Sequence, residues 1–141
     1  MSEFIIALHV LVFLAHDMVS KSSEELSKNV CTNPVRIRKV MSKCKKHGLV
    51  ETKAGINGGY MISKPGNEIT LKDIYDAIDV SLVESKWRSG DIKAECLIAS
   101  GMGDYIDMLF SYFNEELALL LDNITLDMVE QKLKSIRDNK V

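Results

Sequence analysis

The sequence predicts a mainly α-helical fold that carries one small β-hairpin. Apolar residues recur at helical spacing over most of the chain, whereas residues 49–64 show two short strand patterns around a glycine-rich turn. The chain has 141 residues, of which 46% are hydrophobic. That composition argues against general disorder, and the length is enough for one hydrophobic core.

Charge is distributed unevenly along the chain. The formal net charge is only −2, so the whole chain gives no signal for nucleic acid. Residues 28–64, however, contain nine Lys and Arg side chains and a single acid, Glu51. Residues 104–141 contain eight acids and four bases. We infer that only one part of the molecule meets a polyanion.

The apolar run at residues 4–15 predicts a buried helix over Phe4–His16. Twelve residues are too few to span a bilayer, and Glu3 stands where a signal peptide would have a basic residue. Three cysteines without paired spacing do not suggest a disulfide framework. We therefore expect a cytoplasmic protein that does not enter a membrane.

Two short helices follow. Ser22 and Glu25 form a capping-box pattern at the start of a helix that runs to about Val30. Asn33 and Pro34 suit the first positions of a second helix that runs to about His47. Gly48 is placed to end that helix in a left-handed conformation.

The second helix has an apolar stripe and a basic stripe. The apolar stripe comprises Ile37, Val40, Met41 and Cys44. The basic stripe comprises Arg36, Lys39, Lys43 and Lys46, flanked by Arg38, Ser42 and Lys45. A solvated basic face is the alternative interpretation of such a run.

A hairpin pattern follows the basic helix. Strands are expected at residues 49–54 and 60–64, and the turn contains Asn57-Gly58, for which we expect positive φ at both residues. An ordinary surface hairpin is the alternative. Directly after a basic helix, a hairpin indicates the wing of a winged helix–turn–helix, a motif that lays one helix in the major groove of duplex DNA. Thr70 is then expected to cap a helix over residues 71–78.

The motif order resembles a known family. The Asn33-Pro34 helix, the Gly-x-Asn-Gly-Gly-Tyr wing and the segment Ile69-Thr70-Leu71-x-Asp73-Ile74 are similar to those of the IscR/NsrR/CymR-like (Rrf-two) bacterial regulators. The resemblance implies a homodimeric transcription factor, usually a repressor, that binds a pseudo-palindromic operator in double-stranded DNA.

The resemblance also implies which residues contact DNA. The recognition helix would be residues 33–47 and the wing residues 53–60. Arg36 is our first choice for a guanine contact, because recognition helices lead with their N-terminal part. The full set of expected DNA-binding residues is Ser22, Ser23, Asn33, Arg36, Arg38, Lys39, Ser42, Lys43, Lys46, Lys53, Asn57, Gly58, Gly59 and Tyr60.

A long late helix is expected from about Gly103 to Asp122. Its apolar stripe is too long for so small a domain to cover, so we interpret it as a dimer helix; an intrachain core helix is the alternative. The expected interface residues are Met102, Ile106, Leu109, Phe113, Leu117, Leu120 and Ile124, widened by Tyr105, Tyr112 and Leu119. Thr125 is expected to cap a last helix over residues 126–137.

The segment 81–102 is the expected sensor loop. Several members of the resembled family hold an iron–sulfur cluster with three cysteines spaced six apart, and here those positions are Gly90, Cys96 and Met102. Glycine and a thioether cannot replace thiolates, so we expect no cluster and no other cofactor or metal. Cys96 is either a redox thiol or an unreactive cysteine, and neighbouring Glu95 is expected to raise its pKa.

These observations define three segments and two function classes. The segments are a DNA-binding domain (1–80), the sensor loop (81–102), and a dimerisation helix with a C-terminal helix (103–141). The favoured function is a dimeric DNA-binding regulator, responsive to a small molecule or an oxidant. The alternative is a winged-helix adaptor that binds an acidic protein. No nucleophile–base grouping suggests an enzyme.

Overall fold

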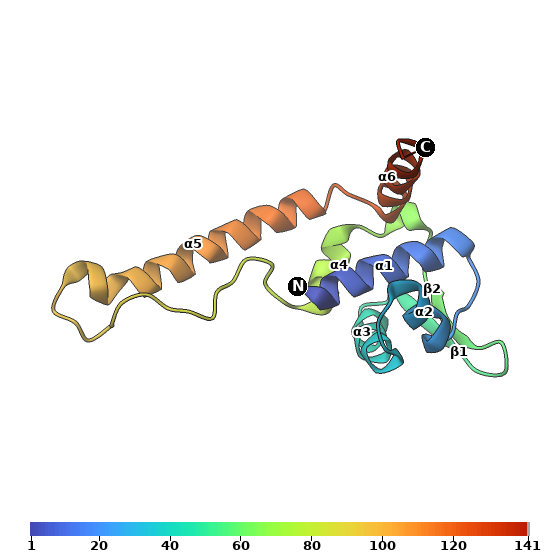
Figure 1. Cartoon of the computed structure of the whole chain (residues 1–141), viewed down its shortest axis with the longest axis horizontal. Coiled ribbons are helices and arrows are strands. Elements are labelled where there is room, and N and C mark those ends of the chain that lie inside the picture. The colour runs from blue at the N-terminus through green and yellow to red at the C-terminus, as the bar shows by residue number, and fades with distance from the viewer. Residues whose placement is uncertain (141) are drawn as a thin grey trace. The chain divides into compact units, whose positions relative to one another are not determined.

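The computed structural model describes residues 1–140, which form two compact units, one of residues 1–80 with 121–140 and the other of residues 81–120. In the first unit (Figure 1) the elements are α1 (Ser2–Asp17), α2 (Ser23–Val30), α3 (Pro34–Lys46), β1 (Val50–Lys53), β2 (Gly59–Ile62), the 3-10 helix η1 (Gly66–Glu68), α4 (Leu71–Ile78) and α6 (Leu126–Asp138). Helix α5 (Leu97–Leu121) makes up most of the second unit.

Helix α1 is the central helix of the first unit. It packs against α2, α3, α4, α6 and β2. Ala7, Val10, Leu11 and Leu14 are completely buried, which confirms the expected buried helix. Among the described residues no helix is both long enough and apolar enough to cross a membrane.

The two helices after α1 begin and end as their sequences predict. Ser22 accepts a hydrogen bond from the backbone N–H of Glu25, and Asn33 accepts one from Arg36. Gly48 has a φ of 70° and ends α3. The apolar stripe of α3 is completely buried, so the opposite face of the helix is free for solvent or a ligand.

The hairpin is confirmed, but its turn differs from the prediction. β1 and β2 are antiparallel, with Val50 opposite Ile62 and Lys53 opposite Gly59. The residues with positive φ are Gly55 and Gly59, not Asn57 and Gly58. The reason is loop length: only a two-residue loop requires positive φ at its central Asn-Gly pair, whereas this loop spans residues 54–58.

The entries to α4 and α6 are joined. Thr70 forms a complete capping box with Asp73, and Thr125 caps α6, as expected. The two threonines lie opposite each other in an antiparallel bridge. The Leu71 N–H donates to the Ile124 carbonyl at 2.8 Å, and the Leu126 N–H donates to the Ile69 carbonyl at 3.0 Å. These bonds attach α6 to the N-terminal part of the chain.

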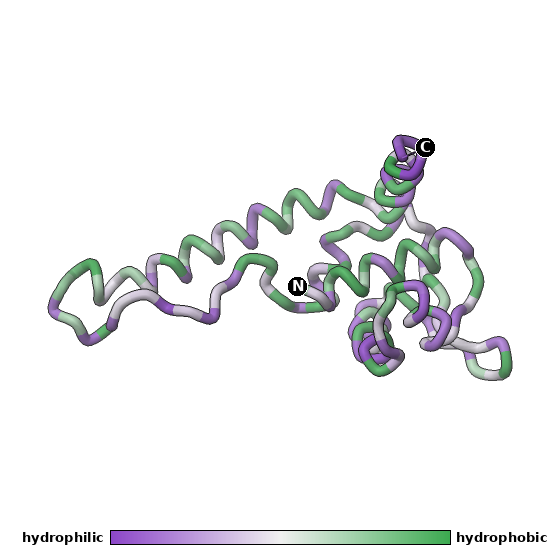
Figure 2. The backbone as a smooth tube through the Cα atoms, viewed as in Figure 1, coloured by the Kyte–Doolittle hydropathy of each residue, from purple (hydrophilic) through white to green (hydrophobic). Residues whose placement is uncertain are grey.

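In the second unit, α5 begins at Leu97, six residues earlier than expected. The prediction was wrong because the apolar stripe on which it rested begins only at Met102, whereas the helix already includes residues 97–101. The lack of a side chain at Gly103 leaves room for Arg88, which pairs with Asp104 and Asp107 of α5. Asn114 accepts hydrogen bonds from the N–H groups of residues 82 and 83. The segment before α5 is thus fastened along the helix, whose alternating hydropathy is visible in Figure 2.

Candidate nucleic-acid interface

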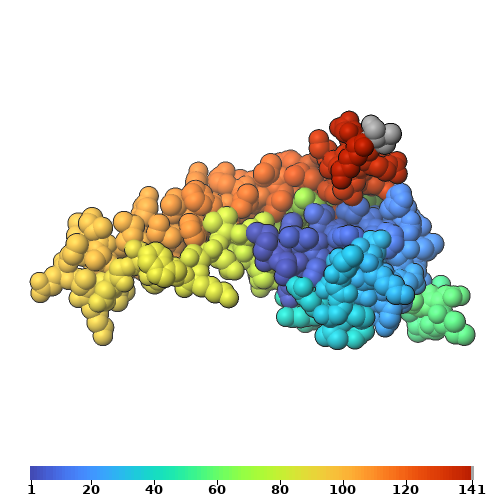
Figure 3. Space-filling model, in the orientation of Figure 1, coloured from blue at the N-terminus to red at the C-terminus, as the bar shows by residue number. Residues whose placement is uncertain are grey.

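The outer surface of α3 carries the candidate interface. Arg36, Arg38, Lys39, Ser42 and Lys46 are exposed, as are Lys53 and Asn57 of the wing. In Figure 3, α2 and α3 (blue to cyan) form one face of the first unit, and the turn of the wing (green) projects beyond it. Basic side chains on an exposed helix next to a projecting hairpin suit contact with a nucleic-acid backbone and groove.

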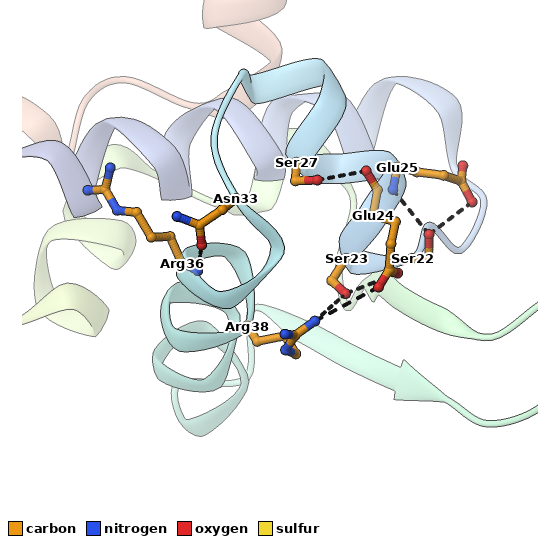
Figure 4. Close-up of polar contacts among 8 residues, drawn as sticks. All are labelled: Ser22, Ser23, Glu24, Glu25, Ser27, Asn33, Arg36 and Arg38. Carbon is orange, nitrogen blue, oxygen red and sulfur yellow. Dashed lines mark hydrogen bonds and ion pairs between the residues drawn. The ribbon is translucent and has the colours of Figure 1, made fainter.

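One flank of α3 faces α2 and the wing. The guanidinium of Arg38 donates to Ser23 Oγ at 3.1 Å and lies 3.9 Å from the carboxylate of Glu24 (Figure 4). Lys45 donates to Thr52 Oγ1 of β1 at 2.9 Å. These contacts bring α3, the start of α2 and the hairpin into one continuous surface.

The other flank of α3 faces the first turn of α1. Figure 4 shows the Arg36 side chain leaving α3 away from the Ser23–Arg38 pair, and its guanidinium donates to Ser2 Oγ at 2.8 Å. Lys39 and Lys43 both pair with Glu3, at 3.1 and 2.6 Å. The hydrogen bond from Lys43 is the main reason why the pKa of Glu3 lies below its usual value. Arg36, Lys39 and Lys43 of the predicted basic stripe therefore lie together on the flank that faces α1. Arg38 and Lys45, which were expected to flank the stripe, make their contacts on the other side.

The wing is held by the segment between α1 and α2. The Tyr60 N–H donates to the Lys21 carbonyl at 2.8 Å, and the Lys21 N–H donates to the Tyr60 carbonyl at 3.0 Å. Ser20 Oγ donates to the Asn57 carbonyl at 2.6 Å. Burial raises the pKa of the Tyr60 hydroxyl, and Arg38 acts against that effect. Gly59 is required here, because a Cβ at this position would lie 2.2 Å from the Lys21 carbonyl oxygen.

Lys21 itself is an uncommon buried cation. Its ammonium pairs with Asp17 at 2.7 Å and lies 4.3 Å from the centre of the Phe13 ring. The hydrogen bond from Lys21 lowers the pKa of Asp17. Because the buried side chain has a carboxylate partner and an aromatic face, the backbone that holds the wing is itself fixed.

Sequence reasoning missed several members of this surface. Val35 is 65% exposed near the N-terminus of α3, and Ile56 is fully exposed in the turn of the wing. Lys45 was treated only as a flanking residue, and Glu3 only as an obstacle to a signal peptide. The position of Val35 opposite the buried stripe was a usable signal. The contacts of Glu3 could not be predicted from the sequence, since Glu3 and Lys39 are 36 positions apart in the chain.

The apolar surface of α5 is broader than the predicted stripe. Phe113 and Leu120 are exposed, but Met102, Ile106, Leu109 and Leu117 are half-buried. Ile124, which the prediction included, lies after the end of α5 at Leu121 and is also half-buried. A well-exposed row lies beside them and consists of Tyr105, Met108, Tyr112 and Leu119, each 57–70% exposed. The residues that were expected only to widen the stripe are therefore among the exposed apolar residues of α5, and Met108 joins them.

Cys96 lies directly before α5 and is exposed. Our expectation that Glu95 raises its pKa was wrong: the backbone N–H groups of Ala99 and Ile98 lower it. The surroundings do not fit an iron–sulfur cluster. At Gly90 a Cβ would lie 2.1 Å from the Ala99 carbonyl oxygen, so no thiolate fits there, and Met102 offers only a thioether. Among residues 1–140, no group of three His, Cys, Asp or Glu side chains is arranged to hold a metal.

A groove of about 490 Å³ lies elsewhere, between α1 and α6. Apolar side chains such as Leu8, Val12 and Leu133 line it. His16 hydrogen-bonds to Glu130 across it. Trp87, in the segment before α5, is 78% exposed.

Comparisons with known proteins agree with this geometry. A family profile described as "Rrf2: Iron-dependent Transcriptional regulator" matches residues 1–132. YwgB of Bacillus subtilis, described as an HTH-type transcriptional regulator, is 28% identical over 117 residues, which cover 78% of this chain and 75% of YwgB. A crystal structure of a Lactobacillus plantarum protein described as a transcriptional regulator has a TM-score of 0.79 and 26% identity, covering 94% of this chain and 89% of that one. CymR, the global cysteine regulator of B. subtilis, has a TM-score of 0.67 and 18% identity, with coverage of 94% and 95%.

Proposed function

The chain belongs to the Rrf2 family of DNA-binding transcriptional regulators, and we propose that it acts as a homodimeric repressor of a pseudo-palindromic operator. The observation that carries the proposal is the continuous basic surface made by α3, the start of α2 and the wing. In this arrangement α3 enters the major groove and the hairpin follows the adjacent backbone.

Individual side chains have different proposed roles. Arg36 remains our proposed guanine contact, and Arg38, on the wing side, is the second candidate. Lys46 and Lys53 contact phosphate, since neither makes an ion pair within residues 1–140. Ser22 and Ser23, at the start of α2, donate to a further phosphate.

The experiment is fluorescence anisotropy on a duplex from the protein's own upstream region and on a scrambled duplex, across a salt series. We expect tighter binding to the first duplex and a steep loss of affinity with salt. Arg36→Met and Arg38→Met separate the two candidates, because loss of a base contact costs about 5- to 150-fold on the operator alone. Lys46→Met lowers affinity for both duplexes, and Lys132→Met on α6 is the control. Equal, salt-insensitive binding would favour the protein adaptor instead.

The dimer is proposed to form through α5. Tyr105, Met108, Tyr112 and Leu119 form an exposed apolar row, which water disfavours unless another surface covers it. A second copy offers an identical row, as expected for a two-fold interface. Sedimentation of Met108→Glu should show a monomer where the native chain is a dimer. Ser111→Glu, which adds the same charge at an exposed polar position of α5, should remain dimeric.

Sensing is proposed to be thiol-based, at Cys96. If so, Cys96→Ser keeps its DNA affinity but no longer loses binding under peroxide. An identical peroxide response in wild type and variant would move the search for an effector to a small molecule, with the groove between α1 and α6 as the first place to look.

A further inference from the structure

The first turn of α1 neutralises part of the basic surface of α3. The two carboxylate oxygens of Glu3 are shared between the ammonium groups of Lys39, at 3.1 Å, and Lys43, at 2.6 Å. The Glu3 side chain is only 20% exposed and that of Lys43 only 33%. Both contacts are closer than the 3.9 Å pair between Glu24 and Arg38, and the contact with Lys43 is also better shielded from solvent; the Lys39 side chain is 68% exposed.

The position of this carboxylate has a consequence for DNA. A lysine contributes to sequence-independent affinity by neutralising a phosphate and releasing condensed counterions. Lys39 and Lys43 already have an anionic partner, so a phosphate has to displace Glu3 or share the lysines with it. A carboxylate left beside the backbone then repels the phosphates at close range. Glu3 thus occupies, within the chain, the place of a phosphate group.

We propose that Glu3 is an intramolecular competitor of the DNA backbone that limits sequence-independent affinity by holding Lys39 and Lys43. This inference rests on the proposed DNA binding. It assigns a function to a residue outside the helix–turn–helix and the wing, and it assigns Lys39 and Lys43 a lower share of the phosphate affinity than their charge suggests.

The test is a double-mutant cycle measured by anisotropy on the scrambled duplex across a salt series. Glu3→Gln should raise affinity by about three- to tenfold at low salt and steepen the log–log salt slope by about 0.9, equivalent to one further phosphate neutralised. Glu3→Asp, which keeps the charge, should stay near wild type. Glu68→Gln makes the same change of net charge at an exposed glutamate that forms no ion pair within residues 1–140, and should have no comparable effect.

The decisive comparison is the same substitution in a Lys39→Gln/Lys43→Gln background. There Glu3→Gln should give a clearly smaller gain, because Glu3 no longer has lysines to hold and the substitution removes only its repulsion of the phosphates. An equal gain in both backgrounds, or no gain in the native background, would overturn the proposal while leaving DNA binding intact. A wild-type chain that binds neither duplex would instead overturn the proposed function, and this inference with it. Helix content by circular dichroism verifies that each variant is folded.

Discussion

The close approach of Gly59 to Lys21 predicts a large and specific effect of Gly59→Ala. Gly59 has a φ of 142°, and a Cβ there would lie 2.2 Å from the Lys21 carbonyl oxygen and 2.9 Å from the Ser22 nitrogen. The substitution adds left-handed strain of about 1–2 kcal/mol. It also separates Lys21 from Tyr60, with the loss of two backbone hydrogen bonds of about 0.5–1.5 kcal/mol each. The reduced conformational freedom of the unfolded chain offsets less than 1 kcal/mol of this cost, so we expect a net destabilisation of about 1–5 kcal/mol.

Gly55→Ala is the matched control. Gly55 also has positive φ, at 104°, but within residues 1–140 no atom beyond Gly55 and its two chain neighbours lies within 4 Å of its added Cβ, so this variant isolates the strain, about 1 kcal/mol. Urea denaturation of both variants measures the difference. Operator anisotropy should show a greater loss of affinity for Gly59→Ala, because the wing is then detached from the start of α2. Equal destabilisation by the two substitutions would refute the role assigned to the Lys21 bridge.

Three further predictions concern other parts of the chain. Thr70→Ala removes the capping box of α4 and should lower the free energy of unfolding, measured by urea denaturation, by about 1 kcal/mol. Thr52→Ala, at an exposed threonine, is the control, and an equal loss of stability in the two variants would contradict the role of the cap. Iodoacetamide should modify Cys96, whose lowered pKa favours the thiolate, before Cys44, whose pKa burial raises to about 12; comparable labelling of Cys44 in the native protein would argue against this order. Lys43 lowers the pKa of Glu3 in the folded state, so the stabilisation is present at neutral pH and disappears as the pH falls through that lowered pKa. The stability difference between wild type and Glu3→Gln should therefore close as the carboxylate becomes protonated in the folded state, and a difference independent of pH would exclude the linkage.

The sequence was sufficient for the parts of the fold that depend on local chemistry. Caps at Ser22, Asn33, Thr70 and Thr125 each require only a residue and the backbone two or three positions ahead, so they were predictable. The buried stripe of α3 follows from helical spacing alone. The start of α5 was not predictable in this way, because Gly103 is tolerated in the helix through packing by Arg88, a residue outside it.

The candidate surface was predictable in its elements but not in its internal partners. Spacing shows that basic residues share the outer side of α3, yet it does not show which neighbour lies against each flank. Lys39 faces Glu3, whereas Lys45 faces Thr52. Both contacts depend on how α1 and the hairpin pack on α3, which helical spacing does not show. The predicted direction of the Cys96 pKa shift was wrong for a related reason. Neighbouring Glu95 is conspicuous in the sequence, whereas the backbone N–H groups that lower the pKa are in place only once α5 begins at Leu97.

Both ends of α1 contribute to the same surface. The first turn supplies Ser2 and Glu3 to one flank of α3, and the segment after its last turn supplies Lys21 to the wing. The helix of 16 residues between them is about 24 Å long, and its Ala7, Val10, Leu11 and Leu14 are completely buried. A buried helix resists bending, so the two attachments hold the basic helix and the wing in a fixed relation. The groove lies along the face of α1 that meets α6, and any partner that shifts α1 from that side therefore acts on both attachments at once.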